Sequence, residues 1–149
     1  MSCILARDVM HPRLSLPAKA KGADVVRKLL SEYPALPVVN EKDEVIGIVS
    51  EYDVFSAVQQ GRTVNEFSAE SIMSCGHDEH TGACDKPVTV FPDTRIEEVV
   101  DLMFNRNFTV VPVVENKKLV GIISRKNVIN AIAEEGFWPE EHFQKRVPK

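Results

Sequence analysis

Two stretches of the chain, Leu36-Pro37-Val38-Val39 and Val111-Pro112-Val113-Val114, are copies of one motif 75 residues apart. A second motif recurs 74 residues apart, as Val45-Ile46-Gly47-Ile48-Val49-Ser50 and Leu119-Val120-Gly121-Ile122-Ile123-Ser124. Over the segments that carry the motifs, 8 of 20 paired positions are identical. The spacing between the two motifs is one residue shorter in the second copy, and the missing residue falls in a polar stretch, where a hairpin loop tolerates a change of length. The chain is therefore an internal duplication.

The composition indicates a globular protein of 149 residues. Hydrophobic residues make up 44% of the chain, charged residues 27%, and the formal net charge is -4. This acidic balance argues against a protein that mainly coats nucleic acid, and the apolar stretches are too short to span a bilayer. Arg7 and Asp8 interrupt the start of the chain before a signal-peptide apolar region can form. We expect a cytoplasmic protein with no membrane or nucleic-acid partner.

Each copy is expected to fold in the order β-α-β-β-α, an α/β chain of α+β type with helices on a small sheet. The first helix of each copy has one apolar face at helical spacing. Its residues are Ala23, Val26, Leu29 and Leu30 in repeat 1, and Ile96, Val99, Val100, Met103 and Phe104 in repeat 2. The predicted divisions are repeat 1 (1–62), a linker (63–87), repeat 2 (88–135) and a tail (136–149). A unit of about 50 residues buries too little surface alone, so the repeats should pack together.

The doubled pattern resembles the cystathionine-β-synthase (CBS) domain, and the pair resembles a Bateman module. The shared features are (Leu/Val)-Pro-Val-Val, a polar turn, and a Gly-containing strand that ends in Ser-x-x-Asp or Ser-x-x-Asn. Asp8-Val9-Met10 and Ser71-Ile72-Met73 resemble the short element ahead of the family's first strand. The resemblance covers residues 8–134. It implies two pseudo-symmetric repeats packed through their small sheets, with adenine nucleotides or related adenosyl ligands in the clefts between them.

The resemblance implies one complete set of ligand-binding residues. The set is Pro34, Ala35, Ser50, Tyr52, Asp53 and Thr94. The carboxylate of Asp53 would accept hydrogen bonds from both ribose hydroxyls. Thr94, at the start of a helix in the other repeat, would meet a phosphate, because free N–H groups and the helix dipole favour anions there. Pro34 and Ala35 would face the base.

The second cleft departs from this pattern. Asn127 replaces the aspartate, Lys19 stands where the threonine is expected, and Ser124 and Lys126 complete the set. Asparagine carries no charge and cannot accept at both ends of a diol. Lys19 and Lys126 would add positive charge beside a phosphate. We expect this cleft to be weaker, to hold a changed ligand, or to be empty.

Each of these residues also has a purely structural interpretation. Serine, threonine, aspartate and asparagine commonly cap helix N-termini without binding a ligand. This interpretation applies to Ser50 with Asp53, to Thr94 and to Asn127. Gly47 and Gly121 are expected to be packing positions, where a side chain would block the neighbouring copy.

The linker holds an unusual cluster of metal-ligand residue types. It contains Cys75, His77, His80 and Cys84, the ligand set of a tetrahedral zinc site. A reversible disulfide between Cys75 and Cys84 is the second interpretation, and a plain polar loop is the third.

We therefore expect a regulatory module, with no catalytic residues and no required cofactor. It would sense AMP, ADP, ATP, S-adenosylmethionine or a related ligand and signal to a separate, unidentified protein. The resemblance implies a homodimer packed through the helices. A metal- or redox-responsive protein that uses the linker cluster is the alternative. An enzyme is disfavoured, because the chain has no Gly-rich phosphate loop, nucleophile elbow or dinucleotide fingerprint.

Overall fold

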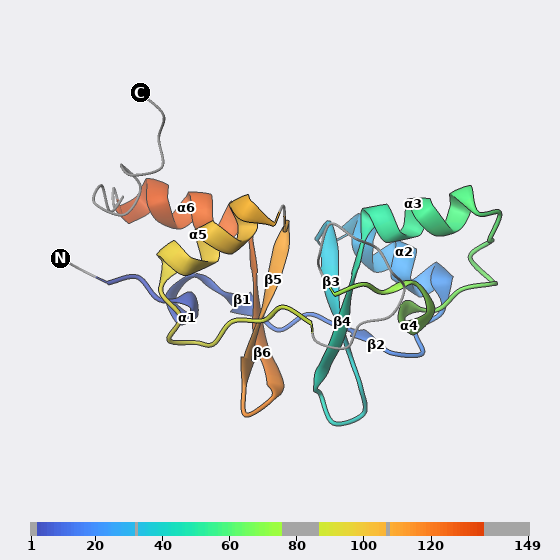
Figure 1. The fold of residues 1–149 in the computed structure, drawn as a ribbon, viewed down its shortest axis with the longest axis horizontal. Helices are drawn as coiled ribbons and strands as arrows, with labels where there is room; N and C mark the ends of the chain where they lie inside the picture. The colour runs from blue at the N-terminus through green and yellow to red at the C-terminus, as the bar shows by residue number, and fades with distance from the viewer. Residues whose placement is uncertain (1–2, 32, 76–86, 107, 136–149) are drawn as a thin grey trace.

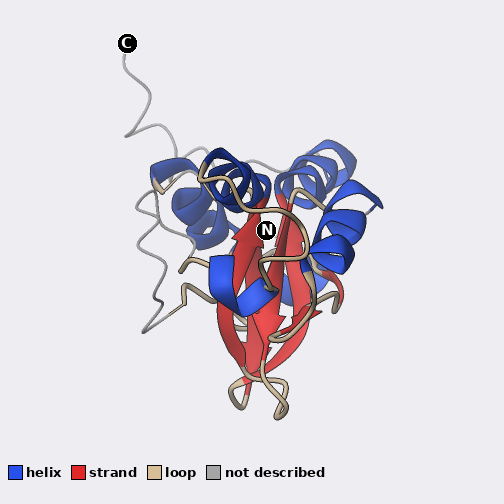
Figure 2. Cartoon of the chain, turned by 90° about the vertical axis from the view of Figure 1, so that its right-hand side faces the viewer, coloured by secondary structure: helices blue, strands red, loops and turns tan. Residues whose placement is uncertain are grey.

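The computed structural model of the chain describes residues 3–31, 33–75, 87–106 and 108–135. Its elements are, in chain order, α1 (Ala6–Val9), β1 (His11–Pro12), β2 (Leu16–Pro17), α2 (Gly22–Ser31), β3 (Ala35–Val39), β4 (Val45–Ser50), α3 (Glu51–Gln59), α4 (Ala69–Ile72), α5 (Ile96–Asn105), β5 (Val110–Glu115), β6 (Lys118–Ser124) and α6 (Arg125–Glu135). The predicted α+β class and the duplicated pattern are confirmed. The longer helices gather at one end of the sheets, and the hairpin turns project from the other (Figures 1 and 2).

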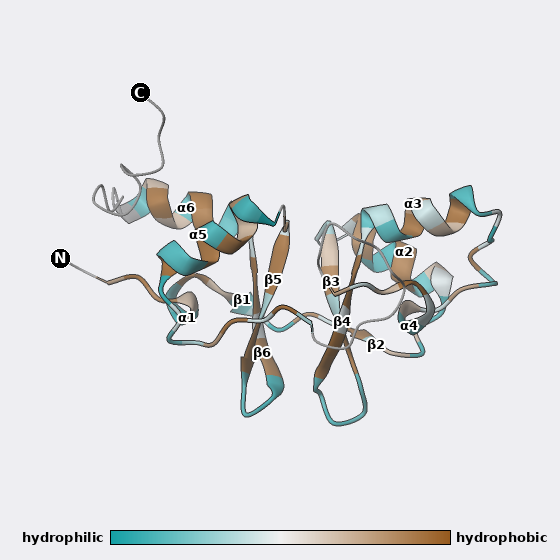
Figure 3. Ribbon diagram, viewed as in Figure 1, coloured by the Kyte–Doolittle hydropathy of each residue, from teal (hydrophilic) through white to brown (hydrophobic). Residues whose placement is uncertain are grey.

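Each repeat builds an antiparallel hairpin from its two apolar strands. β3 pairs with β4 in one sheet, of order β2-β3-β4, and β5 pairs with β6 in the other, of order β1-β6-β5. β2 runs parallel to β3, and Val90 forms the equivalent parallel bridge to Val113. The strands are hydrophobic and the hairpin turns hydrophilic (Figure 3), as expected for strands buried on both faces.

The two repeats exchange the short segments that precede their first strands. β1, from the start of the chain, pairs antiparallel with β6 of repeat 2 through His11 and Ile122. Ser74, which follows α4, pairs in the same antiparallel way with Ile48 in β4 of repeat 1. The boundaries predicted from the sequence follow chain order, whereas each packed unit includes the leading segment of the other repeat.

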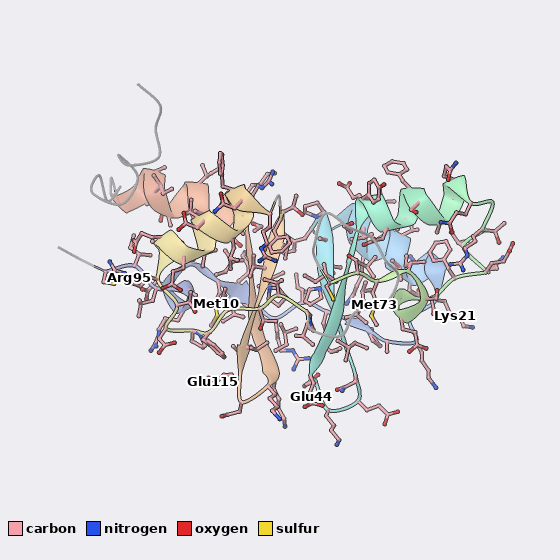
Figure 4. The ribbon with its side chains drawn as sticks, viewed as in Figure 1. Met10, Lys21, Glu44, Met73, Arg95 and Glu115 are labelled. Carbon is pink, nitrogen blue, oxygen red and sulfur yellow. The ribbon has the colours of Figure 1, made fainter. Side chains whose placement is uncertain are left out.

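A glycine on each second strand makes room for this exchange. A Cβ added at Gly47 would lie 2.6 Å from the Sδ of Met73, and one added at Gly121 would lie 2.6 Å from the Sδ of Met10. Both methionines belong to the exchanged segments (Figure 4). The glycines are packing positions, and the group that a side chain would displace is a methionine of the leading segment.

The core is shared between the repeats. One cluster of buried side chains combines repeat 1 residues such as Leu36 and Val49 with Val110, Leu119 and Ile122 of repeat 2. Burial of apolar surface at about 25 cal/mol per Å² dominates the stability of such a core. The sheets therefore stabilise each other.

The first helix of each repeat buries a narrower stripe than the sequence predicts. In α2 the buried apolar side chains are Val25 and Leu29, whereas Ala23 is exposed and Leu30 is 82% exposed. In α5 the buried side chains include Ile96, Val99 and Met103, whereas Phe104 is 86% exposed. The apolar face predicted from the sequence is thus wider than the buried one, because it includes the exposed Ala23, Leu30 and Phe104. Val26, Val100 and Leu102 lie beside this stripe and pack against the core while partly exposed.

Polar contacts gather at the β3–β4 turn: an ion pair within repeat 1 and a backbone hydrogen bond from repeat 2. The guanidinium of Arg13, in the segment between β1 and β2, donates to both carboxylate oxygens of Asp43, at 2.6 and 2.7 Å. Leu119 N–H donates to the Asp43 carbonyl at 3.0 Å. The hydrogen bond from Arg13 lowers the pKa of the Asp43 carboxyl below its ordinary value of 3.8. Above β1, the ring of His11 meets the ring of Tyr33 edge-on, with centroids 5.8 Å apart.

The glycine contacts predict unequal costs for the two alanine substitutions. A Cβ at Gly121 would also lie 2.8 Å from the His11 carbonyl oxygen, whereas the nearest backbone atom to a Cβ at Gly47 is the Ser74 oxygen, at 3.1 Å. We expect Gly47→Ala and Gly121→Ala each to lower the free energy of unfolding by about 1–3 kcal/mol, with the larger loss at Gly121. Denaturant unfolding measures both values.

Double variants provide the control. Adding Met73→Ala should recover part of the loss in Gly47→Ala, because the methionine is the main obstacle there. Adding Met10→Ala should recover less in Gly121→Ala, because a backbone carbonyl remains in the way. Equal costs with full recovery in both pairs would contradict the exchanged packing.

The Arg13–Asp43 pair predicts a pH-dependent contribution to stability. The folded pKa of Asp43 lies below its unfolded value, so the pair contributes above the unfolded pKa and its contribution is lost as pH falls through the folded pKa. Arg13→Gln should therefore lower the melting temperature at pH 7, and its difference from the wild type should shrink as the pH falls below 3.8. Asp43→Asn is the matched control, because asparagine tolerates the positive φ of 65° at this position. If the melting temperatures of Arg13→Gln and the wild type differed by the same amount at pH 7 and in acid, the result would contradict a stabilising ion pair.

Candidate functional site

Ser50 and Asp53 form a reciprocal pair at the start of α3. Ser50 N–H donates to Asp53 Oδ2 at 2.8 Å, and the Ser50 hydroxyl lies 3.0 Å from the same oxygen. Asp53 N–H donates to Ser50 Oγ at 3.3 Å. The extended backbone of Ser50 (φ -114°, ψ 170°) allows this capping box. Asp53 is 3% exposed, so a carboxylate is held almost fully buried at the end of β4.

The segment before β3 lies against this helix start. Glu51 N–H donates to the Pro34 carbonyl at 3.1 Å, and Ala35 is the register partner of Ser50. Pro34 is half-buried and Ala35 is buried, whereas Tyr52 is 60% exposed. The structure therefore brings five of the six residues of the expected first set to one end of β3 and β4. The five are Pro34, Ala35, Ser50, Tyr52 and Asp53.

Thr94 lies apart from this group. Its hydroxyl accepts a hydrogen bond from Phe91 N–H at 2.9 Å, and its carbonyl accepts one from Ala6 N–H at 2.7 Å. Arg95, which follows it, lies at the outer end of α5, whereas α3 begins near the middle of the molecule (Figures 1 and 4). The structure therefore does not bring Thr94 beside Asp53, because α5 begins at the side of repeat 2 that faces away from repeat 1.

The expected equivalence of Lys19 with Thr94 was wrong, by one residue. Ala20 N–H donates to the Pro17 carbonyl at 2.9 Å, and Thr94 N–H donates to the Phe91 carbonyl at 3.0 Å. These matching turns make Ala20 the counterpart of Thr94. Lys19 itself is exposed.

Repeat 2 reproduces the capping box with a neutral partner. Ser124 N–H donates to Asn127 Oδ1 at 2.9 Å, and Asn127 N–H donates to Ser124 Oγ at 3.2 Å. Ser124 is 4% exposed and Lys126 is exposed. Ser124, Lys126 and Asn127 lie together at this helix start because they are neighbours in the sequence.

Ser74 is a polar residue of this region that the sequence reasoning missed. It belongs to the leading segment of repeat 2, yet its N–H and carbonyl both pair with Ile48 of β4 at 2.8 Å. It is 4% exposed. The available signal was its place after Ser71-Ile72-Met73, which matches the place of His11 after Asp8-Val9-Met10. The exchange of segments thus brings a hydroxyl of repeat 2 against the strand that ends in Ser50.

The linker cluster is divided by the limit of the described region. His77, His80 and Cys84 lie outside the described residues. Cys75 lies within them, and its sulfur is in a disulfide bond; its carbonyl accepts from Val88 N–H at 3.3 Å. The thiolate is the form of cysteine that binds zinc, so Cys75 in this state is not a metal ligand. Among the described residues no group of three or more His, Cys, Asp or Glu could hold a metal ion.

A family model of the CBS domain matches residues 6–60 and 83–134. Among curated relatives, the uncharacterized protein MK0525 of Methanopyrus kandleri is 38% identical over 95 residues, which cover 62% of this chain and 43% of that protein. The chain spans between 18% and 55% of the length of the first curated relatives that it matches. In the described residues, no helix combines the length and apolar character that crossing a membrane requires.

Solved structures share this fold at low sequence identity. CBSX2 in complex with AMP has a TM-score of 0.72 and 22% identity, and the match covers 89% of this chain and 98% of that chain. The CBS domain pair of MJ0100, in complex with 5′-methylthioadenosine and S-adenosyl-L-methionine, has a TM-score of 0.70 and 22% identity, with coverages of 90% and 99%. Hypoxic Response Protein I, with two coordinated zinc ions, has a TM-score of 0.69 and 20% identity, with coverages of 85% and 98%.

Proposed function

Because the chain belongs to the CBS domain family, we propose that it is a regulatory module that binds an adenosyl ligand beside Ser50 and Asp53. One observation carries the proposal: a nearly buried carboxylate, Asp53, stands at the end of β4, next to the segment that leads into β3. Its hydrogen bonds to Ser50 fix the carboxylate in place, and a fixed carboxylate is a suitable acceptor for a ligand that carries hydroxyl groups.

The chemistry of the group suits a nucleoside. A carboxylate accepts hydrogen bonds from both hydroxyls of a ribose, and the carbonyl-bearing segment at Pro34 and Ala35 offers an apolar surface to a base. The complexes of neighbouring folds with AMP, 5′-methylthioadenosine and S-adenosylmethionine support this ligand class. ADP and ATP belong to the same class and are included in the test.

Regulation requires the ligand to bind one arrangement of the repeats more tightly than another. We propose that the output is a change in the angle between repeats, read by a separate protein. Two repeat-equivalent pairs of large apolar side chains are exposed on the helices: Leu30 (82%) with Phe104 (86%), and Phe55 (73%) with Ile129 (64%). Apolar groups concentrated on helix faces support a homodimer through these faces. The proposed module is a non-catalytic, cytoplasmic protein.

Redox response through the linker is a second candidate function. The observation that favours it is the disulfide at Cys75. Cys75 directly follows Ser74, which pairs with β4, so a change of covalent state there would act on the strand that ends in Ser50. Zinc binding by the reduced cluster is the related alternative.

Thermal unfolding with a panel of AMP, ADP, ATP, S-adenosylmethionine and NADH tests the principal proposal. A ligand at about 100 times its dissociation constant should stabilise the protein by roughly 2.7 kcal/mol. Asp53→Asn keeps the capping geometry that Asn127 already shows in repeat 2, but it removes the charged diol acceptor. The stabilisation by an adenosyl ligand should therefore fall in Asp53→Asn while the melting temperature without ligand stays close to wild type.

Asp53→Ala is the comparison variant, since it removes both the cap and the acceptor and should cost about 1 kcal/mol without ligand. The absence of stabilisation by every adenosyl ligand in the wild type would rule out the proposal. If the ligand raised the melting temperature equally in the wild type and in both variants, the ligand would not bind at Asp53.

Reductant and zinc separate the two forms of the second candidate. We expect reductant to lower the melting temperature of the wild type, since a disulfide stabilises by about 2–4 kcal/mol, and to leave Cys75→Ser unchanged. Zinc added to the reduced wild type, and to a Cys75→Ser/Cys84→Ser variant, tests the metal. Equal zinc affinity of the two proteins would contradict zinc binding by the cluster. A melting temperature of the wild type that reductant does not change would contradict the redox response.

A further inference from the structure

In repeat 1 the chain that leaves α3 returns over the start of α2. The Phe67 carbonyl accepts a hydrogen bond from Gly22 N–H at 2.9 Å. The Val64 carbonyl lies so close to Gly22 that a Cβ added there would clash with its oxygen. The connector, residues 60–67, therefore covers the first turn of α2 on its way to α4.

Repeat 2 has no such connector among the described residues, because its leading segment comes from the start of the chain. The Ile4 carbonyl of that segment accepts from Ile96 N–H at 3.0 Å, which is the counterpart of the bond in repeat 1. α6 ends at Glu135 on the outer side of repeat 2, where α5 begins (Figure 1). In chain order the C-terminal segment, residues 136–149, follows α6 as the connector follows α3.

The composition of the C-terminal segment predicts that it is buried against something. Its aromatic residues are Phe137, Trp138 and Phe143. Such side chains bury a large area, and the indole N–H usually finds a hydrogen-bond acceptor when it is buried. The spacing of 74 residues that relates Ser50 to Ser124 also relates Val64 to Trp138. The tryptophan thus has the sequence position of the connector residue that lies on the first turn of α2.

The first turn of α5 holds a buried carboxylate that is only half satisfied. Glu97 Oε2 accepts from Arg95 Nε at 2.9 Å, and Glu97 is 4% exposed. Its Oε1 is buried as well, and no group of the described residues donates to it. A buried acceptor without a donor is destabilising. The counterpart in repeat 1 is the exposed Ala23, which requires no donor.

An indole suits this surface in two ways. Its N–H donates and does not accept, which is what Glu97 Oε1 requires. Its ring needs an apolar neighbour, and Phe91 is 58% exposed in the turn that leads into α5. Ile96 stands where repeat 1 has Gly22, so a covering segment cannot approach the backbone as closely here and must pack against side chains.

We propose that the C-terminal segment docks on the first turn of α5 of its own chain, with the indole N–H of Trp138 donating to Glu97 Oε1. The segment then covers repeat 2 as the connector covers repeat 1, and it ties the end of α6 to the start of α5. Both helix ends lie on the outer side of repeat 2, and an extended chain spans about 3.3 Å per residue. The segment is therefore long enough to reach from Glu135.

Fluorescence of the full chain tests the docking, because Trp138 is the only tryptophan in the sequence. In the native wild type its emission should lie at shorter wavelength, and acrylamide should quench it several-fold less, than in the protein unfolded by denaturant. Glu97→Ala should move the emission to longer wavelength and raise the quenching, because the acceptor is lost. Alanine is compatible with this helix position, as Ala23 shows in α2. A tryptophan that is as accessible in the native wild type as in the unfolded protein would overturn the proposal.

Glu98→Ala is the matched control, because it removes the same charge from the exposed neighbour of Glu97 in α5. It should leave the quenching unchanged. Equal quenching in the wild type, Glu97→Ala and Glu98→Ala would place the tryptophan elsewhere and overturn the contact with Glu97.

A double-mutant cycle provides a second measurement that does not depend on fluorescence. Trp138→Phe keeps an aromatic ring but removes the N–H donor, so it should lower the melting temperature of the wild type more than that of Glu97→Ala. Equal losses in the two backgrounds would contradict the hydrogen bond.

Sedimentation at the concentrations used for quenching distinguishes the segment's own chain from a second copy. The quenching should stay unchanged on dilution, whatever the mass of the particle. Protection of Trp138 that disappears as a dimer dissociates would place the segment on the second copy and overturn docking within one chain.

Discussion

The absence of a side chain at Gly47 and Gly121 is the constraint on which the rest of the structure depends. Each glycine lets a methionine of the other repeat's leading segment lie against the middle of a second strand. Without that contact His11 could not pair with Ile122, nor Ser74 with Ile48. Neither repeat is complete without a segment from the other. The pair must therefore fold as one unit, because interiors packed at crystal-like density leave no room for an extra methyl group.

This exchange couples the candidate ligand positions to both repeats. Ser74 pairs with β4 two residues before Ser50, and His11 pairs with β6 two residues before Ser124. A shift of either leading segment acts directly on a strand that ends in a capping box. At the opposite end, the Leu119 N–H bond to the Asp43 carbonyl joins the two hairpins, and the ion pair with Arg13 ties the β3–β4 turn to the segment that follows β1. The contacts at the turns thus restrict movement between the repeats there, whereas a shift of a leading segment would move the strand that ends at a helix start.

The sequence predicts what is local and repeated, and fails where a choice depends on tertiary packing. The hairpins and the Ser50–Asp53 pair follow from motifs whose residues are close along the chain. Lys19 was matched to Thr94 one position out of register, because only the strand pairing shows that Ala18 and Ala20 are the counterparts of Pro92 and Thr94. Leu30 extends the apolar face of α2 in the sequence, but the sheet is too narrow to cover it. The exchange itself has no local signal, since the leading segments would satisfy the same pattern if each packed on its own repeat.

Duplication explains how one small scaffold can hold two positions of different character. The backbone hydrogen bonds at both helix starts are fixed by serine and a side-chain carbonyl or carboxyl oxygen, a requirement that Asp53 and Asn127 meet equally well. Because the cap tolerates either residue, the charge of the acceptor and of its two neighbours can change without loss of the fold. Exposed charges such as Glu51, Arg125 and Lys126 contribute little to stability. The signs of these charges can therefore differ between the two repeats without loss of the fold.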